Sequence, residues 1–280
     1  MLLGVHVCIE GKIYEVLKRA KDLGCNTMQI FSRNPQRWRN KFLDRAEIEE
    51  FVHRQQKLKI SPVFIHIPYL INLASPNPRL YQSSIEAYIE DILEAHLLKA
   101  DFIVTHMGSH KGTGEGAGLR RLTEALNIIL QKTKHTNVGI LLENTAGSGS
   151  WLGYKFIHQK IVLQGLKESK RMGLCLDTAH TYLAGYDIST RRGLEATLNE
   201  IEKLVGTNLI KLIHLNDAKG KLGSNIDRHE HIGKGGIGLE GMKRIINHPR
   251  LRNVAFILET PKDNEYDDKN NLALVRKLRV

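Results

Sequence analysis

Short apolar runs alternate with amphipathic segments along the whole chain. Eight runs consist almost entirely of apolar residues, which is typical of strands buried on both faces. Between them, apolar residues recur at helical spacing, as Ile13, Val16, Leu17 and Ala20 do. The predicted strands cover residues 2–7, 27–31, 62–66, 101–106, 138–143, 173–177, 209–214 and 254–259. The predicted helices cover residues 12–23, 44–58, 81–99, 119–132, 156–169, 193–205, 239–247 and 268–278.

Eight strand–helix units within 280 residues predict the fold class. Their alternation indicates an α/β protein with a parallel sheet, and eight units fit a closed (β/α)8 TIM barrel better than an open doubly wound sheet. No Pro/Ser-rich linker, repeated block or low-complexity segment interrupts the alternation. We therefore expect one TIM-barrel domain over residues 1–280, with its functional side chains at the carboxyl ends of the strands.

Composition and charge indicate where the protein is located and what kinds of partner it binds. Apolar residues make up 41% of the chain, and no apolar run is long enough to span a membrane, so no membrane partner is expected. The three cysteines, Cys8, Cys25 and Cys175, are widely spaced and odd in number, which favours a reducing, cytoplasmic location. The net charge of +11 fits a polyanionic partner such as nucleic acid, although many intracellular enzymes are simply basic.

The last residues of the predicted strands are those that metal ions prefer. Six consecutive strands, from the third to the eighth, end on His66, His106, Glu143, Asp177, His214 and Glu259. Three further residues of the same kinds follow the sixth and seventh strands, namely His180, Asp227 and His229. In a TIM barrel, these positions converge on the face formed by the carboxyl ends of the strands.

Each of these residues alone has an ordinary explanation. A lone His66 would more often be a partly buried imidazole with a hydrogen-bond partner, and a lone Glu259 would more often be a capping or salt-bridging carboxylate. Nine unpaired acids and imidazoles at one barrel mouth would, however, be electrostatically costly without cations. Five imidazoles and four carboxylates suit two or three metal ions with a bridging carboxylate, and the lack of cysteine among them excludes a structural Cys-type zinc site.

The other histidines fit a metal site less well. His6 ends the first strand and is either a buried structural histidine or a group that contacts the ligands from behind. His110 and His231 lie in Lys/Gly-rich loops, where solvation or phosphate contact is expected. The remaining five are predicted to be surface groups on helices or turns: His53, His96, His135, His158 and His248.

Ordered motifs along the whole chain resemble endonuclease IV, the zinc-dependent apurinic/apyrimidinic endonuclease of base-excision repair, also called deoxyribonuclease IV (phage-T4-induced type). The motifs are GVHV at residues 4–7, FSRNPQRW at 31–38, HIPYLINLASP at 66–76, HMGSH at 106–110, LENTAG at 142–147, CLDTAH at 175–180 and LETP at 258–261, together with the segments around His214 and Asp227. The resemblance implies a monomeric enzyme that acts on double-stranded DNA containing abasic sites.

The resemblance also implies a site with three zinc ions per chain. The first zinc would be held by His66, His106 and Glu143, the second by Glu143, Asp177, His214 and Glu259, and the third by His180, Asp227 and His229. It further implies that a hydroxide bridging two of the ions attacks the phosphodiester 5′ to the abasic site, with Glu143 as the catalytic carboxylate. The products would carry 3′-hydroxyl and 5′-deoxyribose-phosphate ends.

Three residues are implied to contact DNA: Arg37 in the minor groove, and Tyr69 with Leu70 as a pair that enters the helix beside the damage. Without the resemblance, Tyr69 and Leu70 would be interpreted as apolar residues that anchor a loop. Two rival functions remain open. A sugar isomerase or epimerase would need fewer metal ions and would leave the positive charge unexplained. A non-catalytic binder of damaged DNA should have lost ligands, and all nine are present.

Overall fold

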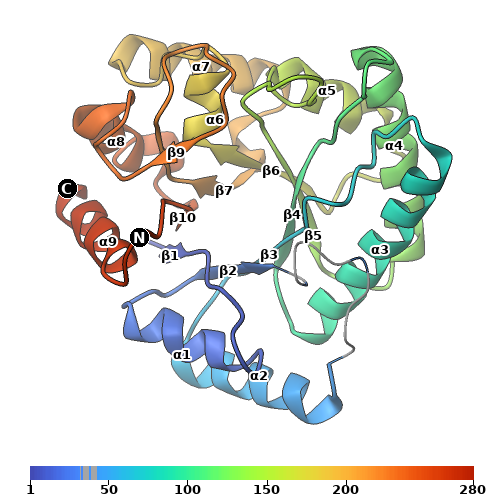
Figure 1. Ribbon diagram of the computed structural model, residues 1–280, viewed down its shortest axis with the longest axis horizontal. Helices are drawn as coiled ribbons and strands as arrows, with labels where there is room; N and C mark the ends of the chain where they lie inside the picture. The colour runs from blue at the N-terminus through green and yellow to red at the C-terminus, as the bar shows by residue number, and fades with distance from the viewer. Residues whose placement is uncertain (32, 34–37, 39–42) are drawn as a thin grey trace.

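The computed structural model describes residues 1–31, 33, 38 and 43–280. Eight parallel strands form a barrel, and helices surround it (Figure 1). The order of strands in the sheet is β1-β10-β7-β6-β5-β4-β3-β2. The two outer strands meet through a bridge between His6 and Gln29 and a hydrogen bond from Val7 N to Gln29 O, which nearly closes the barrel. The predicted TIM barrel is confirmed.

The barrel strands coincide closely with the predicted apolar runs. Their bounds are β1 Leu3–Val5, β2 Met28–Phe31, β3 Val63–His66, β4 Phe102–His106, β5 Gly139–Glu143, β6 Met172–Asp177, β7 Ile210–His214 and β10 Ala255–Leu258. Parallel register places His106 beside Glu143 and Asp177 beside His214, so neighbouring strands end at a similar level.

The helices cover the outside of the barrel, with their buried residues facing the strands. Their bounds are α1 Glu15–Asp22, α2 Arg45–Leu58, α3 Pro78–Leu97, α4 Glu115–Lys132, α5 Phe156–Gly165, α6 Thr178–Leu183, α7 Arg191–Leu204, α8 Gly238–Ile246 and α9 Asp267–Leu278. Short 3₁₀ helices occupy Thr207–Leu209 and Pro249–Leu251. Side chains cap several of these helices: Asp44 accepts from Glu47 N, and Asn77 accepts from Leu80 N. None of the helices in the described ranges is long and apolar enough to cross a bilayer.

Each barrel strand contributes to two apolar layers, and the inner layer shows which strand-end residues point into the barrel mouth. Alternate strand residues point outward and pack under the helices, as Ile65, Ile103 and Ile213 do. The others fill the barrel interior, where a separate cluster contains Phe64, Val104, Leu141, Cys175, Leu212, Ala255 and Ile257. Six of these seven precede a predicted metal ligand by two residues. Because strand side chains repeat with a period of two, each of those six ligands points into the barrel mouth directly above the interior layer.

The loops after β6 and β7 contain structure that the apolar pattern does not predict. Helix α6 begins directly after Asp177, and an antiparallel ribbon of β8 (Asp217–Ala218) and β9 (His229–Glu230) follows β7. Helix α5 also ends earlier than predicted, at Gly165 rather than at residue 169. Helix α6 and strands β8 and β9 are too short to show a periodic pattern of their own.

Candidate metal centre

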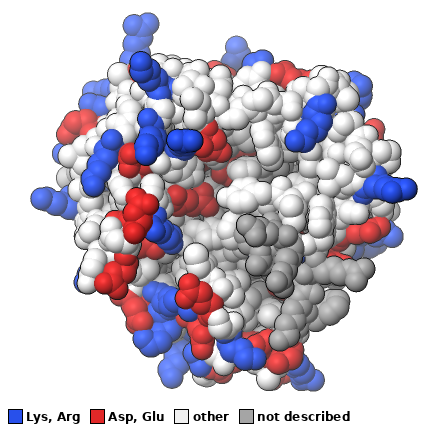
Figure 2. Space-filling view, in the orientation of Figure 1, with Lys and Arg blue, Asp and Glu red and all other residues white. Residues whose placement is uncertain are grey.

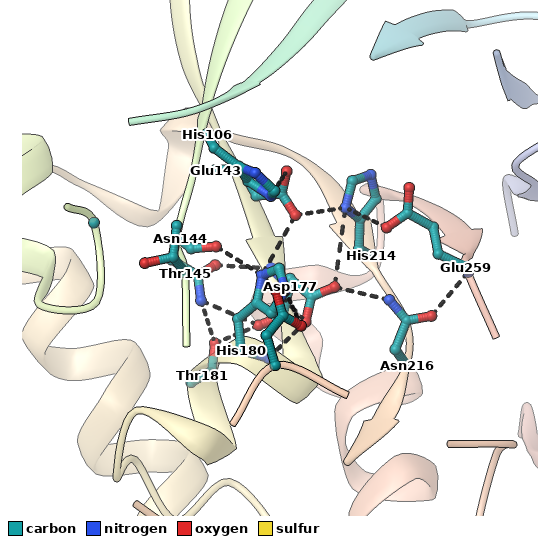
Figure 3. Close-up of polar contacts among 12 residues, drawn as sticks. His106, Glu143, Asn144, Thr145, Asp177, His180, Thr181, His214, Asn216 and Glu259 are labelled. Carbon is teal, nitrogen blue, oxygen red and sulfur yellow. Dashed lines mark hydrogen bonds and ion pairs between the residues drawn. The ribbon is translucent and has the colours of Figure 1, made fainter. Parts of the chain in front are cut away.

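The nine predicted ligands meet at the carboxyl ends of the strands. Six of them complete or directly follow β3, β4, β5, β6, β7 and β10, and the other three belong to α6 and the segment leading into β9. Figure 3 shows Glu143, Asp177, His180, His214 and Glu259 pointing toward one another from separate elements. In three sets of the predicted ligands, each residue offers one ligand atom that lies within 4.8 Å of those offered by the others. The sets are His66, His106 and Glu143; Glu143, Asp177, His214 and Glu259; and Asp177, His180 and His229.

Glu143 belongs to two of these sets. Its Oε2 atom lies 3.1 Å from His66 Nε2 and 3.2 Å from His106 Nε2. Its Oε1 atom lies 2.9 Å from His214 Nδ1, which in turn lies 3.2 Å from Glu259 Oε2. The carboxylate is buried at the end of β5, and His180 Nδ1 also lies 3.5 Å from Oε1. The two oxygens of Glu143 therefore face the first and the second set at once.

Asp227 approaches the third set, and Asp177 belongs to both the second and the third. His180 Nε2 lies 3.1 Å from Asp227 Oδ1, and His229 Nε2 lies 3.8 Å from the same oxygen. Asp177 Oδ2 lies 3.7 Å from His229 Nε2 and 4.0 Å from His214 Nδ1. The structure thus brings Asp227 to the predicted histidines and also places Asp177 between the second and third sets.

Local structure explains how His180, Asp227 and His229 reach the mouth. Asp177 accepts a hydrogen bond from His180 N and begins α6, which places His180 one turn above the strand. Asp227 and His229 return to the site on the β8–β9 ribbon. Asp217 in β8 anchors the segment that follows β9, because its carboxylate accepts hydrogen bonds from the backbone amides of Gly235, Ile237 and Gly238. A Cβ at Gly235 would lie 2.4 Å from Ala218 O, so the close approach requires glycine.

Hydrogen bonds behind the ligands fix the imidazole orientations. Nδ1 of His66 donates to Ile67 O over 2.7 Å, Nδ1 of His180 donates to Asn144 O over 2.9 Å, and Nδ1 of His229 donates to Glu259 O over 3.0 Å. In each of these rings, Nε2 is therefore the nitrogen available to a metal, and it faces carboxylates or imidazoles of the site. Such outer partners orient a metal-binding histidine and raise its basicity.

Two buried amides support the carboxylates, and sequence reasoning missed both. Asn216 Nδ2 donates to Asp177 Oδ2 over 2.7 Å, while its Oδ1 accepts from Glu259 N over 2.8 Å (Figure 3). Gln29 Nε2 donates to Glu259 Oε1 over 2.5 Å. An amide gives no metal-ligand signal in a sequence, although Asn216 does follow the end of β7 closely.

The electrostatics of the site favour a cation. Burial alone would raise the pKa of Glu143, but the imidazoles of His106 and His214 hold it well below its ordinary value. Burial would lower the pKa of His180, but the carboxylates of Asp177, Asp227 and Glu143 raise it to about 10. In the absence of metal, protons must therefore balance the buried carboxylates. Imidazole nitrogen and carboxylate oxygen are also the donors that zinc accepts, so the residues present fit the implied zinc.

Cys175 also lies near this centre, two residues before Asp177 on β6. Its sulfur is within 4.8 Å of ligand atoms of Glu143 and His214. Burial in the apolar layer raises the pKa of the Cys175 thiol to about 12, so it stays protonated at neutral pH.

We expect the metal-free protein to lose stability as the pH rises from 6.5 to about 10. The pKa of His180 rises from its ordinary 6.5 to about 10 on folding, so its proton stabilises the fold fully below pH 6.5. That contribution disappears as the pH passes through the folded value. Thermal unfolding of chelator-treated protein should show Tm falling across this window, and His180→Gln should flatten the profile. A constant Tm in the chelator-treated wild type would contradict the assignment.

An open cavity of about 470 Å³ lies over the centre. Its lining includes Tyr69, Lys219, Arg228 and Pro261 in addition to several predicted ligands. Figure 2 shows acidic side chains in the hollow at the middle of this face, and both basic and acidic side chains around it. The floor of the hollow thus suits cations, while Lys219 and Arg228 in the cavity lining can attract an anionic chain.

Of the three residues predicted to contact DNA, the structure describes Tyr69 and Leu70. Tyr69 is 60% exposed at the edge of the cavity, with its ring centroid 5.9 Å from that of His66. Leu70 is half-buried beside it. Arg37 lies outside the described residues. The loop that carries Tyr69 is anchored by Asn72, which donates to Ser109 O and accepts from Ser109 N.

The predictions for the remaining histidines need two corrections. His158 and His248 are buried rather than on the surface. His158 donates to Glu115 and accepts from Gly153 N, and His248 donates to Glu195, so partners from neighbouring segments satisfy both rings. His110 accepts from Gly114 N at the start of α4.

Two more loop and strand-end histidines lie beside the centre rather than within it. His231 accepts from Asn271 and forms a separate group with Asp263 and Asp267. His6 is buried and contacts the site from behind through Gln29, which agrees with one of the two roles predicted for it.

The chain is similar to known proteins over almost its whole length. The family model described as xylose isomerase-like TIM barrel matches residues 17–279. A probable endonuclease 4 from Methanoculleus marisnigri is 41% identical over 278 residues, which cover 99% of each chain. A probable endonuclease 4 from Halothermothrix orenii is 41% identical over 279 residues, which cover 100% of this chain and 99% of that one.

Solved structures resemble this chain at two levels of sequence identity. The crystal structure of endonuclease IV from Thermus thermophilus superposes with a TM-score of 0.88 at 33% identity, over 99% of this chain and 98% of that one. A D-tagatose 3-epimerase-like protein superposes with a TM-score of 0.74 at 18% identity, over 99% of this chain and 97% of that one. The second likeness reflects a shared fold alone.

Proposed function

Since this chain belongs to the endonuclease IV family, we propose that it hydrolyses the phosphodiester bond 5′ to abasic sites in duplex DNA. The products would carry 3′-hydroxyl and 5′-deoxyribose-phosphate ends. One observation carries the proposal: six barrel strands deliver a His, Asp or Glu to one mouth, where the ligand atoms form overlapping sets that share Glu143 and Asp177. Such shared carboxylates suit a multinuclear centre rather than a single ion.

Three zinc ions per chain fit the ligand sets. His66, His106 and Glu143 would hold the first; Glu143, Asp177, His214 and Glu259 the second; His180, His229 and Asp227 the third. When bound, zinc would supply Lewis acidity that activates water near neutral pH and stabilises the negative charge on the departing 3′ oxygen. Glu143 would face the first two ligand sets at once, and its carboxylate would fix the position of one set relative to the other.

The chain's own residues would bind and orient the DNA. Lys219 and Arg228 line the cavity on adjacent positions of the ribbon, where Lys219 N donates to Arg228 O over 3.0 Å, and their charges would attract the phosphate backbone. Tyr69 and Leu70 extend from an anchored loop at the edge of the same cavity. An abasic nucleotide has no base stacking to lose, so it can be turned into the cavity while the pair fills the gap.

The same barrel could serve a ketose epimerase, as the fold likeness to the D-tagatose 3-epimerase-like protein illustrates. That reaction would leave the exposed Tyr69 and the net charge of +11 without a role. The decisive test compares a duplex containing one abasic site, the undamaged duplex and a ketose substrate. We expect incision of the abasic duplex only, at its 5′ side, with a 3′ end that a polymerase can extend. Ketose epimerisation without incision would reject the proposal.

A further inference from the structure

The two barrel strands that end without a predicted ligand nevertheless reach the metal centre. β1 leads into His6, and β2 contains Gln29, and a bridge joins these two residues. Both side chains are buried. The amide of Gln29 contacts two predicted ligands, His214 and Glu259, and also contacts His6. All eight strands of the barrel therefore contribute a polar side chain to the same site.

The orientation of the Gln29 amide follows from its neighbours. Its Nε2 lies 2.5 Å from Glu259 Oε1 and 3.0 Å from His6 Nδ1, while its Oε1 lies 2.8 Å from His214 Nε2. The reverse orientation would place a carbonyl oxygen against a carboxylate oxygen, and both are acceptors. The amide nitrogen must therefore face Glu259, and the amide oxygen must face His214.

This orientation determines which nitrogen of His214 can bind a metal. An amide oxygen only accepts, so His214 Nε2 must carry a proton and donate it. The nitrogen that remains available to a metal is then Nδ1, which lies 2.9 Å from Glu143 Oε1 and 3.2 Å from Glu259 Oε2. His214 thus differs from the three histidines that donate from Nδ1 to a backbone carbonyl and offer Nε2: His66, His180 and His229.

We propose that Gln29 is a positioning residue for the second ligand set, because it selects the Nε2–H tautomer of His214 and holds the carboxylate of Glu259. The inference rests on the proposed zinc centre. Gln29 touches no substrate in this role; it acts through two ligands at once. A merely structural buried amide would affect the stability of the fold, whereas a positioning amide must affect metal affinity as well.

The first test measures zinc binding by Gln29→Met, which keeps the length of the side chain and removes all its hydrogen bonds. Gln159→Met is the matched control, because Gln159 is also buried and donates to Gly153 O, outside the three ligand sets. In competition with a chelator, Gln29→Met should bind zinc roughly 10- to 100-fold more weakly than the wild type. Gln159→Met should match the wild type. Unfolding of the metal-free form should remain cooperative in both variants.

The second test needs no substitution. In the zinc-loaded wild type, ¹⁵N–¹H correlation spectra should show the imidazole proton of His214 on Nε2 and those of His66, His180 and His229 on Nδ1. A His214 proton on Nδ1 would overturn the inference, even if Gln29→Met does not fold. Zinc binding by Gln29→Met equal to that of a zinc-binding wild type would overturn it too, and would leave the proposed function intact. A wild type that binds no zinc would overturn both.

Discussion

Glu143→Gln should lower the rate of incision at abasic sites at least roughly a hundredfold while leaving DNA binding largely unchanged. The substitution keeps the size of the side chain but removes the negative charge that faces both the first and the second ligand sets. Glu143 Oε2 lies 3.1 Å from His66 Nε2, and Oε1 lies 2.9 Å from His214 Nδ1, so no neighbouring carboxylate can replace it in both places. Single-turnover cleavage of an abasic duplex measures the effect.

A matched control separates this effect from general damage to the barrel. Asp101 is a partly buried carboxylate at the opposite end of β4, where it accepts from Val63 N, so Asp101→Asn should keep most of the incision rate. Near-normal turnover by Glu143→Gln would refute the bridging role. A loss of DNA binding as large as the loss of rate would also refute it, because the role is confined to the reacting centre.

The double substitution Tyr69→Ala/Leu70→Ala should weaken binding to abasic duplex by roughly 30- to 100-fold, with a much smaller effect on undamaged duplex. Tyr69 is exposed at the edge of the cavity, and the anchor through Asn72 holds its loop in place. Without these side chains, the gap left by a displaced abasic nucleotide stays empty, and the contacts that offset unstacking are lost. The dissociation constants of the two duplexes measure the effect.

Zinc content should not change in this double variant, because neither side chain belongs to a ligand set. Tyr266→Ala/Leu97→Ala is the control, since Tyr266 is as exposed as Tyr69, Leu97 is also exposed, and neither lines the cavity. If the Tyr69/Leu70 variant keeps the full preference for abasic DNA, damage is recognised by other residues.

Much of the fold and the ligand set could be predicted because both follow from one periodicity. Apolar runs such as residues 138–143 indicate strands, and the period of two places Glu143 above Leu141 inside the barrel. The convergence of the strand ends then follows from the barrel itself. The family indicated by the ordered motifs is confirmed by full-length relatives at 41% identity.

Features that depend on tertiary partners could not be predicted in the same way. The β8–β9 ribbon has strands of two residues each, and Asp217 holds its loop through backbone amides distant in the sequence. Gln29 looks like any polar residue in a strand until His214 and Glu259 are placed beside it. His158 has the sequence context of a surface helix residue, and its burial depends on Glu115 from another helix.

Incision at abasic sites should require a centre with three metal ions. The most direct measurement is a titration of metal-free protein with zinc, in which incision of an abasic duplex and bound metal per chain are followed together. Activity should be absent at the start and should reach its plateau when three equivalents are bound, as elemental analysis of the active enzyme should confirm. Full activity in the thoroughly metal-free protein, or a plateau at a single equivalent, would contradict the account.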